Sequence, residues 1–387
     1  MTTETASSVT GEPAATAQSA ASATKSLPPP DPTKNVLGVP YPPASDKATI
    51  MDEMSQDYPF IWLSTGYNKD NVVAWSPKVR VVVRVANAKE DDVLEIQHLQ
   101  GKKKLGAPQK CMPKGYPWKA DGTTLIKFDC PPAEDIKLTD AGAFAASLTY
   151  IQTSAGKRQE DFATLKYNVI KYRADAKPTK PDMKFAVDYD FHIGDAWIYP
   201  EITASNIHPE YTHDPLTPLY AVIHTWLKWE KQEPSGPVMR CYLGDKEVAQ
   251  ATGNERTDAE YTFYKDAKSD SEKIGWAKYK FRFDSMVYQN ALDPDARKNF
   301  KSLHVLADNP GDYTCKVTHQ GDVIRVIKFS FKGNDVVRSE CEKNLVTFSP
   351  TALISVTEMK GDAPFDKNAY KKYGFFNRTE WPAGCPK

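Results

Sequence analysis

A segment near the middle of the chain contains the residues best suited to metal chemistry. It includes His192, His208 and His213, three of the seven histidines, together with Asp190 and Asp195. Imidazole and carboxylate ligands bind Zn²⁺ and other transition metals, so a metal-assisted hydrolase is one candidate function. The histidine spacing matches neither an i, i+4 helical pair nor a known metal motif. A polar connector between two domains is therefore the favoured interpretation of this segment, and we expect no cofactor.

Aromatic side chains outside the repeated core give a second candidate chemistry. Exposed rings stack on sugars and also anchor protein interfaces, which makes a carbohydrate-binding module an alternative function. The competing interpretation is that most of these rings fill hydrophobic cores. The candidates are Tyr116, Trp118, Tyr264, Trp276, Tyr288 and the C-terminal group Tyr370, Tyr373, Phe375, Phe376 and Trp381.

Enzyme signatures and electrostatic signals are missing from the sequence. It contains no Gly-x-Ser-x-Gly elbow, His-Glu-x-x-His motif, phosphate loop or dinucleotide fingerprint. Lys plus Arg and Asp plus Glu both number 50, which gives no argument for nucleic acid as a partner. No apolar stretch approaches the ~20 residues that span a bilayer. We therefore expect a protein that is not an enzyme, without a transmembrane segment.

A duplication organises most of the chain. The segment Asn309–Cys315 reads Asx-x-Gly-x-aromatic-x-small, and Asp140–Ala146 repeats this pattern. Val93–Ile96 also matches Val238–Cys241, and further matches follow in the same order in both copies. The aligned positions of the motif are Gly142 and Phe144 in the first copy and Gly311 and Tyr313 in the second.

The motif resembles the corner that opens strand F of an immunoglobulin-like sandwich, where a tyrosine precedes a cysteine by two residues. The resemblance implies an all-β protein with two tandem antiparallel immunoglobulin-like β-sandwiches. It also implies that the Tyr313 hydroxyl bonds a backbone group upstream. Phe144 keeps the ring without the hydroxyl, so we expect a weaker corner in the first copy.

Alternating or continuous apolar patterns predict the strands, and a short helix is predicted at Asp293–Leu303. The expected divisions are a disordered Ala/Ser/Thr/Pro-rich tether at 1–48, a first sandwich at 57–173, a linker at 174–184, a second sandwich at 185–333 and a C-terminal extension at 334–387 packed on the second sandwich. The predicted strands are Phe60–Leu63, Val79–Val85, Val93–Leu99, Thr124–Phe128, Phe144–Ile151, Ala163–Tyr172, Ala196–Tyr199, Tyr220–Trp229, Val238–Leu243, Tyr261–Tyr264, Trp276–Phe283, Gly311–His319, Val323–Phe331 and Ala352–Thr357.

The six cysteines are expected to form three disulfides. Cys241 and Cys315 of the second copy align with Ile96 and Ala146, so both thiols are absent together from the first copy. Cys111 and Cys130 occur only in the first copy, which leaves Cys341 to pair with Cys385. Disulfides indicate an oxidising compartment. Six unpaired thiols in a cytoplasmic protein are the alternative.

The sequence favours a non-catalytic extracytoplasmic module with a binding or structural role. The N-terminal segment lacks a basic start and a hydrophobic stretch, so it is not a signal peptide. It is similar to the flexible tether of bacterial surface lipoproteins, which implies that a leader preceding it was removed. We expect a protein partner at the cell surface or in the periplasm, with carbohydrate as the alternative ligand.

Overall fold

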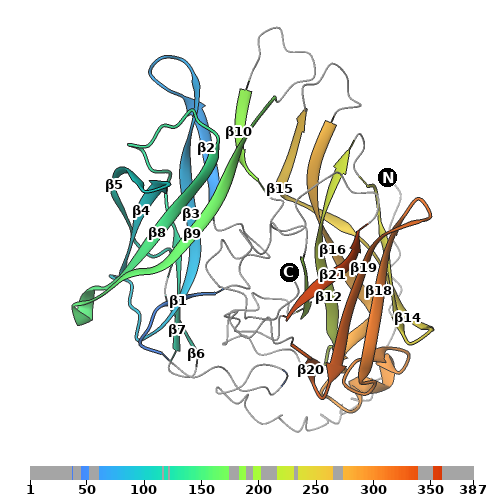
Figure 1. The fold of residues 1–387 in the computed structure, drawn as a ribbon. Helices are drawn as coiled ribbons and strands as arrows, with labels where there is room; N and C mark the ends of the chain where they lie inside the picture. The colour runs from blue at the N-terminus through green and yellow to red at the C-terminus, as the bar shows by residue number, and fades with distance from the viewer. Residues whose placement is uncertain are drawn as a thin grey trace, which may run out of the picture. The chain divides into compact units, whose positions relative to one another are not determined.

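The fold is described by a computed structural model, which is all-β (Figure 1). Its only helices among the described residues are short 3-10 turns, such as η2 (Thr153–Ala155) and η5 (Ala296–Phe300), and none is long and apolar enough to cross a membrane. The structure describes residues 37, 45–51, 61–115, 117–120, 123–173, 183–188, 195–201, 216–230, 234–264, 273–338 and 352–359. Most of the segments expected to form the tether, the linker and the C-terminal extension lies outside these residues. Leu37 and Ala48, at the C-terminal end of the segment expected to be a disordered tether, are described, and both are buried in hydrophobic cores.

The first copy contains one complete antiparallel sheet and part of a larger one, which continues into the second copy through the pairing of Arg173 with Tyr264. In one sheet β3 pairs with β1, β2 and β7, and β7 pairs with β6. In the other the order is β5, β4, β8, β9 and β10. The strands are β1 (Thr49–Ile50), β2 (Ile61–Tyr67), β3 (Val73–Ala86), β4 (Val93–Gln100), β5 (Lys103–Cys111), β6 (Trp118–Ala120), β7 (Thr123–Asp129), β8 (Gly142–Gln152), β9 (Lys157–Arg173) and β10 (Met183–Val187).

The second copy repeats this pairing. Its β14, β13, β18 and β19 follow the order of β5, β4, β8 and β9, and its central pair β12–β16 corresponds to β3–β7. β21 pairs with β11 and with β19, so the predicted C-terminal strand joins both sheets. The strands are β11 (Asp195–Pro200), β12 (Leu219–Glu230), β13 (Val238–Leu243), β14 (Lys246–Thr252), β15 (Asn254–Tyr264), β16 (Lys273–Gln289), β17 (His304–Val305), β18 (Gly311–His319), β19 (Asp322–Lys332), β20 (Asp335–Val336) and β21 (Ala352–Met359).

The two copies therefore have the predicted all-β class, with antiparallel sheets consistent with a β-sandwich fold. Strands with clear apolar patterns follow the sequence closely: in β3, Val79, Val81, Val83 and Val85 are all buried and face the core. β5 was not predicted, because Lys, Gly and Pro interrupt its pattern. The helix predicted at Asp293–Leu303 is only the 3-10 turn η5.

The corner of the second sandwich matches the expectation. The Tyr313 hydroxyl donates to the Asn309 carbonyl over 2.6 Å, and His304 Nε2 lies 2.8 Å from the same hydroxyl. Gly311 has a φ of 155°, and a Cβ there would lie 2.8 Å from Leu243 Cδ1. Glycine is therefore favoured by the backbone conformation, and a larger residue would also have to displace the Leu243 side chain.

The first sandwich replaces the missing hydroxyl with a different donor. Trp75 lies edge-on to Phe144 with ring centroids 4.8 Å apart, and its indole N–H donates to the Asp140 carbonyl over 2.9 Å. Asp140 aligns with Asn309, so a side chain donates a hydrogen bond to the equivalent carbonyl in both corners. In the first sandwich, whose corner lacks a tyrosine, Trp75 of β3 therefore supplies the hydrogen bond to the corner carbonyl.

Replacing Tyr313 with phenylalanine should lower the free energy of unfolding of the second sandwich by about 1 to 2 kcal/mol. The substitution removes the bond to the partly buried Asn309 carbonyl but keeps the ring. Urea unfolding measures the effect. Tyr242→Phe is the matched control, because the Tyr242 hydroxyl has only an exposed 3.4 Å contact with Glu247. Equal losses in the two variants would contradict a structural role for the corner.

The structure contains the two disulfides expected within the sandwiches, and they have different roles. Cys111–Cys130 joins the end of β5 to the residue after β7, and so links the two sheets of the first sandwich. Cys241 lies directly opposite Cys315 on the adjacent strands β13 and β18. This second bond is therefore within one sheet, unlike the inter-sheet disulfide of antibody domains. Cys341 and Cys385 lie outside the described residues, so their pairing stays a prediction.

The register corrects the alignment of the two copies around this disulfide. Ala146 corresponds to Cys315, as predicted, but the residue opposite Ala146 is His98, whereas Ile96 lies opposite Leu148. His98, not Ile96, therefore occupies the place of Cys241. Aligning His98 with Cys241 also places the two-residue turns after β4 and β13 at equivalent positions.

Candidate interaction surface

The structure does not test the metal candidates. His192, His208, His213 and Asp190 lie outside the described residues, and Asp195 begins β11 with only its backbone described. Within the described part of the chain, no group of three or more His, Cys, Asp or Glu side chains is arranged to hold a metal ion.

The aromatic candidates that the structure describes are interior residues. Trp276 is 2% exposed, with the Lys228 ammonium 5.2 Å from its ring centroid, and Tyr288 is fully buried. Neither ring can stack on a ligand at the surface. Only the backbones of Trp118 and Tyr264 are described, and Tyr116 and the C-terminal aromatic group lie outside the described residues.

The β2–β3 hairpin presents the most exposed large hydrophobic side chain among the described residues. Tyr67 at the end of β2 is 66% exposed, and Val72 just before β3 is 48% exposed. Figure 1 shows this hairpin (blue) extending at the upper end of the first sandwich. We call Tyr67 and Val72 the hairpin tip. An exposed tyrosine is a typical anchor of protein interfaces.

Hydrogen bonds fix the backbone of the turn between these residues. The Asn68 amide donates to the Val72 carbonyl over 2.9 Å, and the Asn71 amide donates to the Asn68 carbonyl over 3.0 Å. The Asn68 side chain accepts bonds from the Asp70 and Val72 amides. Asn71 has a φ of 58°, a conformation that asparagine adopts more readily than most residues. The turn is ordered before any partner binds, which reduces the entropy lost on binding.

A charged cluster surrounds the lower part of the same hairpin. The Arg80 guanidinium lies 4.3 Å from the Trp62 ring centroid, and the Lys78 ammonium lies 5.5 Å from it. Asp129 accepts from Arg80 over 2.9 Å and from Lys114 over 3.2 Å, and its other oxygen lies 3.5 Å from Lys78. We call Trp62, Lys78, Arg80, Lys114 and Asp129 the base cluster.

The base cluster holds more positive than negative charge among the described residues. Burial raises the pKa of Asp129, but hydrogen bonds from Arg80 and Lys114 overcome it and lower that pKa to about 2. The pKa of the neighbouring Lys127 is lowered by burial and then by the charge of Arg80. The ionised Asp129 carboxylate is therefore shared by Lys78, Arg80 and Lys114. Lys127 is close enough to be repelled by Arg80.

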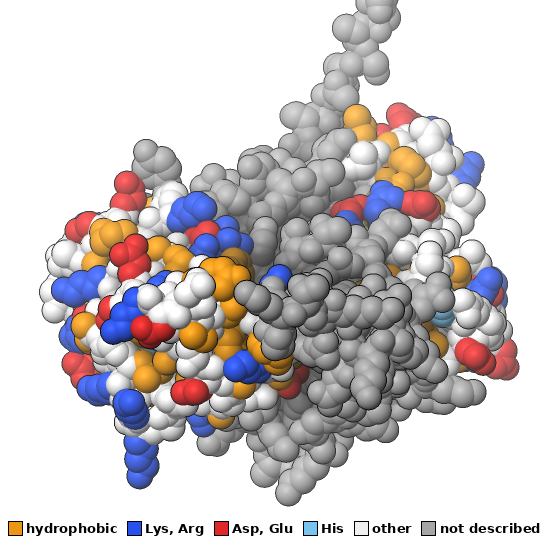
Figure 2. Space-filling model, turned by 90° about the horizontal axis from the view of Figure 1, so that it is seen from above, with side chains coloured by type: hydrophobic (Ala, Val, Ile, Leu, Met, Phe, Trp, Pro, Cys, Tyr) orange, Lys and Arg blue, Asp and Glu red, His pale blue; other side chains and the backbone are white. Residues whose placement is uncertain are grey.

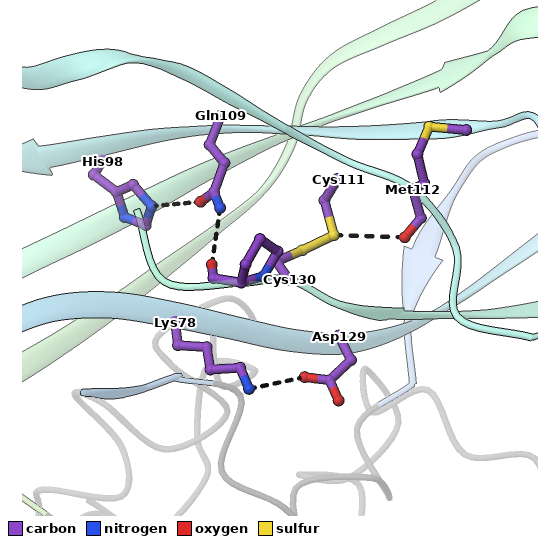
Figure 3. The surroundings of a disulfide bond; sticks show 8 residues. Lys78, His98, Gln109, Cys111, Met112, Asp129 and Cys130 are labelled. Atoms are coloured by element: carbon purple, nitrogen blue, oxygen red, sulfur yellow. Dashed lines mark hydrogen bonds and ion pairs between the residues drawn. A yellow bond between two sulfur atoms is a disulfide. The ribbon is translucent and has the colours of Figure 1, made fainter. Parts of the chain in front are cut away.

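The Cys111–Cys130 disulfide positions two members of this cluster. Cys130 directly follows Asp129, and Cys111 is three residues before Lys114, whose amide also donates to the Lys127 carbonyl over 2.8 Å. Figure 3 shows Lys78 pointing toward Asp129 close to the disulfide. The bond thus holds the loop that contains Lys114 against β7.

The equivalent face of the second sandwich has a different charge balance. Asp284 corresponds to Asp129, and Arg282 stacks on Tyr220 with 4.3 Å between the guanidinium carbon and the ring centroid. Here two acids, Glu201 and Asp284, pair with Lys280 and Arg282. The shortage of carboxylates is therefore specific to the first copy among the side chains that the structure describes.

The hairpin surface has no clear signature in the sequence. Trp62 falls in a predicted strand, where an aromatic ring suggests core packing. The only available signal was the turn-forming run Asn68–Asn71 between apolar segments, which predicts a hairpin but not the exposure of its ends. Figure 2 looks down on this end of the first sandwich, where hydrophobic and charged side chains are mixed.

No protein-family model, curated protein or solved structure matches the chain.

Proposed function

We propose that this protein is a non-catalytic binding or structural module that contacts a protein partner through the hairpin tip. The observation that supports the proposal is the exposure of Tyr67 and Val72 on an ordered turn. Tyrosine supplies a large contact area with few rotatable bonds, so little entropy is lost when a partner covers it. Among the aromatic candidates for carbohydrate binding, the two whose side chains the structure describes, Trp276 and Tyr288, are buried.

We further propose that the protein functions outside the cytoplasm. The two disulfides support this location, because cytoplasmic reductants keep most thiols reduced. The location is tested by alkylating thiols in intact host cells before lysis and mapping the cysteine peptides. Alkylated Cys241 and Cys315 in freshly trapped protein would contradict an oxidising compartment.

The double variant Tyr67→Ala/Val72→Ser should lose its partner. Truncating a central anchor commonly costs 2 kcal/mol or more, so capture from the host extract should fall at least about thirtyfold. Capture is measured by quantitative mass spectrometry with the wild-type chain as reference. The thermal midpoint should not change, because both side chains are largely exposed.

Val337→Ser is the matched control for this experiment. Val337 is 50% exposed, close to the value for Val72, but lies in the second sandwich beyond β20. This variant should capture the same proteins as the wild-type chain. Identical capture by the wild-type chain and the hairpin variant would contradict the proposal, as would specific binding to a glycan array in place of a protein.

A further inference from the structure

The base cluster has room for a further negative charge, because its three cations share one carboxylate. Asp129 is almost buried, and its two oxygens already contact Lys78, Arg80 and Lys114. The lysine side chains remain accessible, with 26% of Lys78 and 68% of Lys114 exposed. An added carboxylate would find two reachable ammonium groups that share a single acid.

The Trp62 ring adds an apolar surface with a fixed orientation beside Lys78 and Arg80. Arg80 stacks on the ring and is held at the same time by Asp129, so the guanidinium and the indole fix each other. A ligand would meet a half-buried aromatic ring beside two lysines. Such a surface suits an acidic segment that contains apolar side chains better than an isolated small anion.

We infer that the partner presents an acidic polypeptide segment to the base cluster while its apolar part covers the hairpin tip. This inference rests on the proposed function and names the chemistry of the partner. The β2–β3 hairpin contributes to both surfaces, because β2 runs from Trp62 near its start to Tyr67 at its end. Five residues of strand span roughly 17 Å, which fits within one protein interface, and side chains five positions apart point to opposite faces, so the partner would reach both surfaces around the edge of the hairpin.

A fluorescently labelled deca-glutamate peptide tests the charge requirement by anisotropy, with deca-glutamine as the neutral reference. The full chain should bind deca-glutamate at low salt, and the double variant Lys78→Gln/Lys114→Gln should bind it roughly tenfold more weakly. Binding should weaken as salt screens the charges. Lys298→Gln/Lys301→Gln is the control, because Lys298 is 67% exposed, close to Lys114, and lies in η5 and the residue after it. This control should bind like the wild-type chain.

Three results would overturn the inference. These are equal binding of the acidic and neutral peptides, equal weakening in the control variant, and binding of a sulfated oligosaccharide where deca-glutamate does not bind. Tyr67→Ala/Val72→Ser should bind deca-glutamate normally, since the tip lies away from the charges. Loss of partner capture in that variant, together with failure of deca-glutamate to bind, would reject the acidic segment and leave the proposed function standing.

Discussion

Replacing both Cys241 and Cys315 with alanine is expected to lower the free energy of unfolding of the second sandwich by about 4 kcal/mol. The two residues are 74 positions apart, so the bond removes much of the freedom of the unfolded chain. Cys111 and Cys130 are only 19 positions apart, and the same model gives about 3 kcal/mol for that pair. Urea unfolding of the two double variants measures both values.

The comparison between the two double variants isolates the effect of loop length. All four cysteines are buried, so the packing lost on substitution by alanine is similar in each pair. Adding a reductant to the wild-type chain should reproduce the loss in the second sandwich. A loss at the Cys111–Cys130 pair well above that at Cys241–Cys315 would show that its link between the sheets matters more than chain entropy.

Acidification from pH 7 to pH 4 is expected to cost the first sandwich about 3 kcal/mol through His98 alone. His98 is fully buried, and its burial lowers the pKa to about 4 despite the opposing effects of Gln109 and Asp135. Below pH 6.5 the His98 imidazole is protonated in the unfolded chain but stays neutral in the folded chain, so the free energy of unfolding falls. Near pH 4 the folded state also binds the proton, and the loss stops growing.

His98→Leu tests this expectation by removing the titrating group. The free energy of unfolding, measured in urea between pH 7 and pH 4, should fall less steeply in the variant than in the wild-type chain. The Asp129 carboxyl does not interfere, because its pKa is lowered from 3.8 to about 2 and it loses stabilising charge only below pH 4. Parallel curves for the two proteins would contradict a buried neutral His98.

The sequence alone determined the class of fold and the position of most strands. Apolar alternation in β3 and β8 and the corner at Gly311 and Tyr313 are local patterns, and each corresponds to an element of the structure. The pairing of Cys241 with Cys315 also followed from comparing the copies. These features were readable because side-chain periodicity and turn chemistry depend on neighbouring residues.

The surface that supports the proposed function was decided by the tertiary structure. The exposure of Tyr67 depends on how far the hairpin extends. The base cluster joins β2, β3, the loop after β5 and β7, and no local pattern states that Lys78 and Lys114 share Asp129. Such contacts join residues that are distant in sequence, and only strand pairing brings them together.

The register also explains why the copies could not be aligned fully from sequence. Ile96 and His98 are two residues apart, so both point to the same face of β4, and both are buried. Shifting the alignment of the copies by one residue would match buried apolar positions with exposed ones. Shifting it by two residues keeps the alternation of buried and exposed side chains intact. Only the pairing of His98 with Ala146 distinguishes the two alignments, and that pairing is a property of the folded sheet.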